Sequence, residues 1–318
     1  MKQLLQNLDT GETYIEEIPE PNLKDNFVKI QNFNSVISPG TEKMLVQFGQ
    51  ANLLQKAISQ PDRVKDVYSK IKTDGITSTF DAVKSKLKEP IPLGYSSAGV
   101  IIESRSPFFS VGDRVVSNGP HSEVVSVNHN LCALIPDGLK YEDAAFTVIG
   151  SIALQGIRVL DPRIGENIAV FGLGLLGIIT CQLLKLNGCN VLGVDIDESK
   201  CKLANDFGID TFLNQGTQEL NNKSYLFSNN IGMDGVIITA ASHSNEVMHQ
   251  AALISKQRGK IVLVGSVGLD LKREDFYEKE LSFQVSCSYG PGRYDEVYEV
   301  DGVDYPVGFV RWTEKRNF

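Results

Sequence analysis

A glycine-rich segment at 172–177, GLGLLG, constrains this chain more than any other feature. The apolar run IAVF before it predicts a buried strand, and the run LLGIITCQLLKLNG that starts within it predicts a helix. In such a strand–turn–helix unit, the first glycine makes the turn and the second lets the backbone approach a pyrophosphate. The third allows the helix to pack closely on the strand, and the amides at the helix N-terminus favour an anion. The segment therefore predicts a dinucleotide-binding unit.

An acidic residue follows at the spacing that this unit requires. Asp195 stands 18 residues after Gly177, at the end of the strand-like run VLGVD. A carboxylate there can accept hydrogen bonds from both hydroxyls of the adenine ribose, and it repels a 2′-phosphate. No arginine occurs in 195–202 to attract that phosphate, so the segment favours NAD over NADP. Asp195 could instead cap the next helix, but Asp197 is better placed to do so.

Strand-like and helical runs alternate through the second half of the chain, from IAVFG to LSFQV. About six strands with intervening helices predict a doubly wound parallel sheet, the Rossmann arrangement. Ligands bind at the carboxyl ends of such strands. The predicted cofactor-binding residues are Gly172, Gly174, Leu175, Leu176, Gly177, Asp195, Lys200, Ala240, Gly265 and Val267.

The first half is β-rich. A hairpin is expected around Gly11, and further strands at 27–30, 97–103, 114–117, 122–127 and 131–135 predict a small irregular barrel. Lysine-bearing stretches at about 44–90 have helical spacing and predict a helical insertion; their alternating charges are typical of a solvated surface. Helical spacing is also expected at 141–160.

The bulk composition excludes several classes of protein. The chain has 318 residues, of which 42% are hydrophobic, enough for two packed domains. A formal net charge of −8 argues against binding nucleic acid. The five cysteines are scattered and the start lacks the apolar run of a signal peptide, so we expect a cytoplasmic protein. The uncharged segment 167–184 has nearly the length of a membrane span, but its glycines favour strand, turn and buried helix, so no membrane association is expected.

Several short motifs together resemble the medium-chain dehydrogenase/reductase family, in which a GroES-like β domain precedes a Rossmann domain. They are GYSSAGV at 94–100, VGDRV at 111–115, HSEV at 121–124 and DAA at 143–145. The segment SPGTE at 38–42, the lysine-rich insertion and the tail YGPGRY at 289–294 further resemble the amino-terminal half of bacterial two-domain oxidoreductases, whose second half is glucose-fructose-oxidoreductase-like. A more distant resemblance is to bacteriochlorophyllide dehydrogenases.

The resemblance implies a zinc-free branch. Zinc relatives need Cys, His and Cys ligands around the metal. The corresponding positions fall here on Ser38 or Pro39, on Tyr95 and near Ser151, and no stretch holds four clustered cysteines. We therefore expect neither a catalytic nor a structural metal.

Without zinc, a side chain must polarise the substrate. Thr41 aligns with the proton-relaying hydroxyl of zinc relatives, Tyr95 replaces a ligand, and Glu42 is an adjacent carboxylate; these three are the catalytic candidates. Thr41 and Glu42 could instead cap a helix that starts near Lys43, and Tyr95 could fill the space of the metal. His121 follows Gly-Pro and is expected to be a turn residue.

The resulting expectation is a GroES-like domain at 1–145, a Rossmann domain at 146–288, and a tail at 289–318 that stops before the usual return to the β domain. We expect a zinc-independent NAD(H)-dependent oxidoreductase acting on a hydroxyl or carbonyl of a small molecule, such as a sugar derivative. The alternatives are a catalytically decayed NAD-binding subunit or part of a larger enzyme, and a quinone or enoyl reductase. The resemblance also suggests a homodimer, and the missing return to the β domain suggests instead a C-terminal partner domain.

Overall fold

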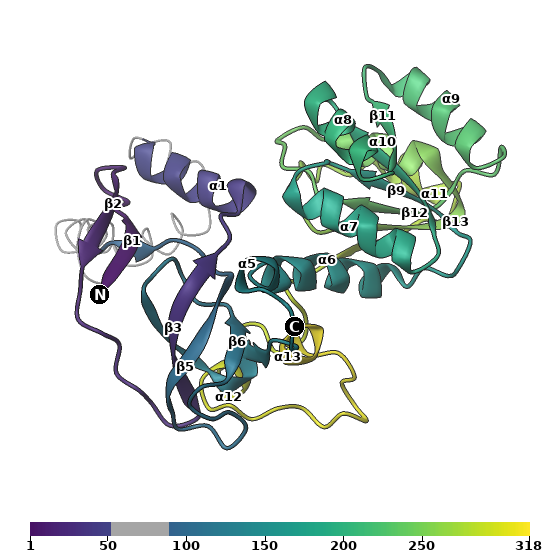
Figure 1. Ribbon diagram of the computed structural model, residues 1–318. Helices are drawn as coiled ribbons and strands as arrows, with labels where there is room; N and C mark the ends of the chain where they lie inside the picture. Colours follow the sequence, from purple (N-terminus) through teal and green to yellow (C-terminus); the bar gives the residue numbers. More distant parts are fainter. Residues whose placement is uncertain (52–88) are drawn as a thin grey trace, which may run out of the picture. The chain divides into compact units, whose positions relative to one another are not determined.

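The computed structural model describes residues 1–51 and 89–318 of the chain. These residues form two compact units, Met1–Phe146 and Thr147–Phe318 (Figure 1). The division falls one residue beyond the expected domain boundary. Residues 289–318, which we expected as a separate tail, belong to the second unit. Most of the expected helical insertion at about 44–90 lies outside the described residues.

The first unit begins with the predicted hairpin. Strands β1 (Lys2–Gln6) and β2 (Thr13–Glu17) pair antiparallel, and β4 (Ile91–Pro92) pairs with β1 on its other side. Gly11 lies in the connection with φ +76°, a conformation that glycine adopts without strain.

A five-stranded antiparallel sheet forms the main core of this unit, as the predicted strands indicate. Its order is β7-β3-β5-β6-β8. Buried side chains from these strands and from Phe109 make up one hydrophobic cluster, which includes Val28, Ile30 and Ile101. The strands are β3 (Phe27–Ser35), β5 (Ser97–Ser104), β6 (Arg114–Ser117), β7 (Val124–Asn128) and β8 (Cys132–Leu134), with the 3-10 helix η1 (His129–Leu131) before β8.

Helix α1 (Pro39–Gln50) starts earlier than expected. Ser38 is its N-cap residue and Pro39 occupies the first turn, where a missing N–H costs nothing. The expected helix at 141–160 consists of two segments, α5 (Tyr141–Ala144) and α6 (Thr147–Leu160), which meet where the two units divide. For α1, Pro39 marks the start of the helix, and the expected start near Lys43 did not take this signal into account.

The second unit contains a six-stranded parallel sheet of order β11-β10-β9-β12-β13-β14. Within this sheet the chain runs from the central strand β9 outward to β11. It then crosses back to β12, beside β9, and continues outward to β14. This is the predicted doubly wound Rossmann topology. Its strands are β9 (Asn167–Phe171), β10 (Asn190–Asp195), β11 (Asp210–Leu213), β12 (Met233–Ile238), β13 (Ser255–Leu263) and β14 (Ser282–Val285).

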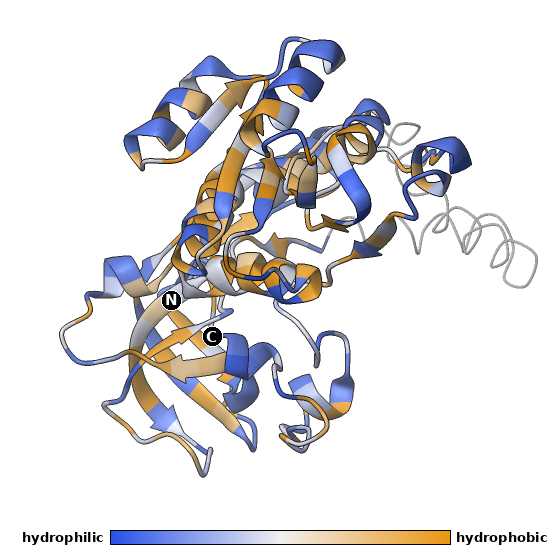
Figure 2. Cartoon of the chain, turned by 90° about the vertical axis from the view of Figure 1, so that its right-hand side faces the viewer, coloured by the Kyte–Doolittle hydropathy of each residue, from blue (hydrophilic) through white to orange (hydrophobic). Residues whose placement is uncertain are grey.

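Two hydrophobic clusters cover the two faces of this sheet. Because successive strand residues point to opposite faces, Ile168 and Val170 of β9 enter one cluster, and Ala169 and Phe171 enter the other. Figure 2 shows hydrophobic residues, in orange, along much of the strands. The first cluster is completed by α6, α7 (Leu175–Leu186) and α8 (Glu198–Asp206), and the second by α9 (Thr217–Phe227), α10 (Glu246–Ile254) and α11 (Arg273–Tyr277).

The C-terminal segment packs onto α6 of the same unit. Asn317 accepts a hydrogen bond from Arg158 at 2.8 Å through its side chain and another from the Ser151 hydroxyl at 2.7 Å through its carbonyl. Tyr289 and Tyr298 are buried, whereas Phe309 is 90% exposed. The segment contains the short helices α12 (Glu296–Glu299) and α13 (Glu314–Asn317). Part of its aromatic surface is therefore covered from within the unit.

Among the described residues, Tyr141–Leu160 is long and apolar enough to cross a membrane by length and composition alone, and half of it is buried inside the structure. A buried core helix passes the same test. The uncharged segment 167–184 instead forms strand β9, a turn and most of helix α7, as its glycines predict.

Candidate dinucleotide site and a second polar cluster

The glycine-rich turn connects β9 to α7. Gly172 has φ +93°, and a Cβ built there would lie 2.7 Å from the backbone of Ala240. A Cβ on Gly177 would lie 1.7 Å from the Gly172 carbonyl oxygen, so no larger residue fits. A Cβ on Gly174 would meet nothing within 4 Å. Gly172 and Gly177 are therefore needed for the turn and for its packing. Gly174 leaves open space beside the backbone, which is the space that a pyrophosphate requires.

Helix α7 starts beside that open space. Gly174 is the N-cap residue, and the first bond inside the helix joins the Ile178 amide to the Gly174 carbonyl. The amides of Leu175, Leu176 and Gly177 consequently have no acceptor within the helix. The first turn holds no acidic residue. These amides and the helix dipole favour an anion at this point.

Asp195 ends β10 and closes the glycine turn. Its Oδ2 accepts a hydrogen bond from the Leu173 amide at 2.6 Å, and its Oδ1 accepts one from the Asp197 amide at 2.9 Å. Each carboxylate oxygen has a second lone pair, so two further donors can bind. Lys200 Nζ lies 3.9 Å from Oδ2. The carboxylate therefore has a structural role in the turn and keeps the acceptor capacity that ribose hydroxyls need.

The neighbouring Asp197 is the residue that caps the next helix. Its carboxylate accepts hydrogen bonds from both the amide, at 2.9 Å, and the hydroxyl of Ser199. The bond from the Ser199 hydroxyl, and after it the bond from the Ser199 amide, holds the pKa of Asp197 below its usual range. Asp197, and not Asp195, therefore caps α8, as the sequence predicted.

The ends of β12 and β13 meet the glycine turn. The Thr239 hydroxyl donates to the carbonyls of Phe171 at 3.0 Å and Gly172 at 2.7 Å, which fixes the turn from the side of β12. A Cβ on Gly265 would lie 2.2 Å from the Ala240 carbonyl oxygen. Gly172, Ala240 and Gly265 are therefore packed together, as expected for the central crevice of such a sheet. Val267 is 9% exposed and belongs to a hydrophobic cluster, so its side chain serves the core.

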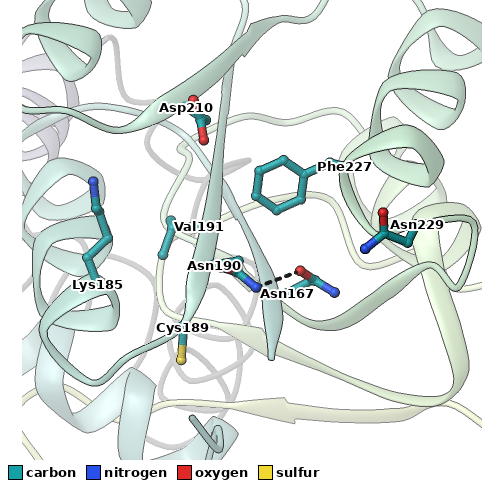
Figure 3. Close-up of a pocket in the computed structure, with 8 residues that line it drawn as sticks. All are labelled: Asn167, Lys185, Cys189, Asn190, Val191, Asp210, Phe227 and Asn229. Atoms are coloured by element: carbon teal, nitrogen blue, oxygen red, sulfur yellow. Dashed lines mark hydrogen bonds between the residues drawn. The ribbon is translucent and has the colours of Figure 1, made fainter. Parts of the chain in front are cut away.

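A hollow of about 360 Å³ lies at the opposite edge of the same sheet (Figure 3). Asn167, Asn190 and Asp210, the first residues of three adjacent strands, contribute to its lining. Burial raises the pKa of the Cys189 thiol in this hollow, which disfavours the reactive thiolate. Since ligands of doubly wound sheets bind at the carboxyl ends of the strands, this hollow is distinct from the dinucleotide site.

The first unit holds a second polar cluster around Glu42, which is 6% exposed. Glu42 Oε1 accepts a hydrogen bond from the Ser38 amide at 2.7 Å, at the start of α1. Glu42 Oε2 lies 3.0 Å from His121 Nε2. The other ring nitrogen of His121, Nδ1, lies 2.8 Å from Ser35 Oγ. Glu42 therefore stabilises the helix start, one of its two expected roles, and also pairs with a histidine.

The structure places the other two catalytic candidates differently. Tyr95 is half-buried and its hydroxyl donates to Ser38 Oγ at 2.7 Å, so Tyr95 and Glu42 both contact Ser38. Thr41 is exposed on the first turn of α1. The sequence patterns did not indicate Ser38 as catalytic and predicted only a turn residue at His121. His121 does lie in a bend before β7, but no pattern in the sequence indicated that it pairs with Glu42.

The residues at the expected zinc positions do not fit a zinc ion. Tyr95 and Ser38 offer hydroxyls that bond to each other, and Ser151 donates its hydroxyl to backbone carbonyls of the second unit. Within residues 1–51 and 89–318, no three or more His, Cys, Asp or Glu side chains gather where they could hold one metal ion. Zinc sites are built from such groups.

Comparisons with known proteins agree with this architecture. Residues 176–300 match the family described as zinc-binding dehydrogenase. D-guloside 3-dehydrogenase from Escherichia coli K12 is 30% identical over 237 residues, covering 70% of this chain and 63% of that enzyme. An alcohol dehydrogenase from Geobacillus stearothermophilus is 33% identical over 155 residues, covering 48% and 44%. The chain thus aligns with less than two thirds of the length of these relatives.

Solved structures share the fold along most of the chain. Galactitol-1-phosphate dehydrogenase from Escherichia coli matches with a TM-score of 0.71 at 17% identity, over 92% of this chain and 85% of that one. The 2R,3R-butanediol dehydrogenase from Bacillus subtilis matches with a TM-score of 0.67 at 19% identity, over 91% and 84%. Together with the Rossmann topology and the glycine turn, these similarities show that the chain belongs to the medium-chain dehydrogenase/reductase superfamily.

Proposed function

We propose that this protein is a zinc-independent dehydrogenase that uses NAD to oxidise a secondary hydroxyl of a sugar or polyol derivative. The observation that carries the proposal is the glycine turn with Asp195 bonded across it. The similarity to D-guloside 3-dehydrogenase supports the substrate class. The five free cysteines, four of them buried, fit a reducing compartment and support our expectation of a cytoplasmic enzyme.

The predicted cofactor-binding residues would contact different parts of the dinucleotide. The amides of Leu175, Leu176 and Gly177 would hold the pyrophosphate, and Asp195 would accept from the ribose hydroxyls. A 2′-phosphate beside Asp195 would meet a buried carboxylate, and Lys200 already faces that carboxylate at 3.9 Å. This favours NAD over NADP and argues against a quinone or enoyl reductase that prefers NADPH.

The nicotinamide ring takes the hydride from the substrate carbon, and the protein must accept the proton from the substrate oxygen. In the first unit, Tyr95, Glu42 and Thr41 remain the candidates for that task. Tyr95 and Thr41 would donate or accept a hydrogen bond at the substrate oxygen, and Glu42 would receive the proton. Hydroxyls in place of Cys and His ligands support a mechanism without zinc.

The test is an assay of the chain after treatment with a chelator, with NAD⁺ and a methyl D-guloside, galactitol 1-phosphate and 2R,3R-butanediol as probes. We expect NAD⁺ reduction with at least one polyhydroxylated probe. Tyr95→Phe should lower kcat about a hundredfold through loss of the hydroxyl. Tyr294→Phe is the matched control, because that ring is 75% exposed in the other unit. A chain that binds NADH but oxidises none of the probes would favour a nucleotide-binding subunit without catalysis.

A further inference from the structure

A continuous set of hydrogen bonds runs from the buried Glu42 to the protein surface. Glu42 Oε2 and His121 Nε2 are 3.0 Å apart, and their side chains are 8% and 9% exposed. His121 Nδ1 and Ser35 Oγ are 2.8 Å apart, and Ser35 is exposed at the end of β3. Both nitrogens of one imidazole thus have partners, one on the buried side and one on the solvent side.

Neighbouring backbone fixes the position of His121. A Cβ on Gly94, which has φ +89°, would lie 2.7 Å from three ring atoms of His121, so only glycine leaves room for the ring. The His121 amide donates to the Leu93 carbonyl at 2.8 Å, and the His121 carbonyl accepts from the Leu4 amide at 2.9 Å. The Ser38 amide fixes Glu42 from the other side. The bonds are therefore preorganised rather than formed by mobile surface groups.

An imidazole with partners on both nitrogens can carry a proton between them. A neutral ring with its proton on Nδ1 accepts a proton at Nε2 and then releases the first one from Nδ1. A nearby carboxylate stabilises the imidazolium that exists between these two steps.

We propose that Glu42, His121 and Ser35 form the path by which the substrate's hydroxyl proton reaches solvent. The proposal deepens the proposed function and rests on it. The proton moves from the substrate oxygen to Glu42, from Glu42 Oε2 to His121 Nε2, and from His121 Nδ1 through Ser35 Oγ to water, while the hydride leaves with the cofactor. In carbonyl reduction the same steps run backwards. His121 is a positioning and relaying residue, since it acts through Glu42.

The test removes the imidazole ring of His121 by mutation and then adds imidazole bases from solution. His121→Ala should lower kcat for the probe oxidised by the wild type about a hundredfold and leave the NADH dissociation constant unchanged. Imidazole and methylimidazoles should restore turnover, and the restored rate should rise with the pKa of the added base. His121→Gln keeps a donor toward Glu42 but carries no proton, so it should fold and remain slow even if the alanine variant does not fold.

His249→Ala is the matched control, because His249 also pairs with a carboxylate, Asp275 at 2.9 Å, in the second unit. It should keep wild-type kcat. Wild-type turnover by His121→Gln would overturn the relay but leave the proposed function standing. Rescue that is independent of the base's pKa would also overturn it, because it would show that the ring only fills space. A wild type that binds NADH and oxidises no probe would overturn the proposed function and the relay together.

Discussion

At the scale of single residues, Asp195 has a structural role in the glycine turn, and the same carboxylate is the one we propose to bind the ribose. Its two oxygens accept from the amides of Leu173 and Asp197, and so connect the glycine turn to the loop after β10. The lone pairs that remain are those expected to recognise the ribose. Spacing after the glycine motif is enough to identify this residue, but the bond to Leu173 depends on the fold and is not predictable from spacing.

Asp195→Asn should weaken NADH binding about tenfold or more, because hydrogen bonds to a charged acceptor contribute about 1.5–3 kcal/mol each. Isothermal titration with NADH measures this directly. Asp197→Ala serves as the control: it removes the cap of α8 and should cost about 1 kcal/mol of stability while leaving NADH affinity unchanged. An unchanged affinity in Asp195→Asn would remove the assigned ribose contact.

Glu314 should make the stability of the protein depend on pH. It is fully buried, and neither carboxyl oxygen has a hydrogen-bond partner among the described residues. Burial, and to a lesser degree Glu299, raises its pKa to about 8, although Arg293 opposes the shift. Between its ordinary value of 4.5 and about 8, the folded state therefore holds a proton that the unfolded state has lost.

The free energy of unfolding should consequently fall as pH rises through this window, by up to about 1.4 kcal/mol per pH unit, and level off above it. Denaturant titrations at several pH values measure the slope. Glu314→Gln should abolish this component, whereas Glu296→Gln, at an exposed site, should retain it. Equal slopes in the wild type and Glu314→Gln would contradict the assignment.

At the scale of elements, the sequence predicts the second unit better than the first. The strands from β9 to β14 are apolar runs separated by helical ones, so periodicity and alternation suffice to give their order in the chain and the parallel sheet. For helix α1, the predicted start near Lys43 is too late because Pro39 opens its first turn. The Glu42–His121 pair escapes prediction because it joins residues 79 apart in the chain, and no local pattern reports such contacts.

Gly177 and Gly174 of the turn should respond differently to alanine. Gly177→Ala should cost about 3 kcal/mol or more of stability, because its Cβ would overlap the Gly172 carbonyl. Gly174→Ala should change stability by less than about 0.5 kcal/mol, since its Cβ meets no atom within 4 Å. It should nevertheless weaken NADH binding at least tenfold, because the methyl group enters the space for the pyrophosphate. Denaturation and NADH titration of both variants separate folding from binding, and tight NADH binding by Gly174→Ala would contradict the pyrophosphate's position.

At the scale of the whole molecule, the chain consists of two units with different chemistry. The second unit carries the Rossmann sheet and the residues that we propose bind the dinucleotide, and the first carries the cluster of Tyr95, Ser38, Glu42 and His121. The superfamily resemblance predicts this division, since in that family a GroES-like β domain precedes a Rossmann domain. Ser38 and Tyr95, at two of the positions expected for zinc ligands, bond to each other, which is why we assign proton transfer to side chains.

The central claim is that the chain binds NAD through Asp195 and the glycine turn. Parallel titration of the full 318-residue chain with NADH and NADPH, followed by nicotinamide fluorescence, tests it most directly. We predict that NADH binds and that NADPH binds at least tenfold more weakly, because the buried carboxylate of Asp195 repels a 2′-phosphate. NADPH binding as tight as NADH, or no binding of either, would contradict this claim.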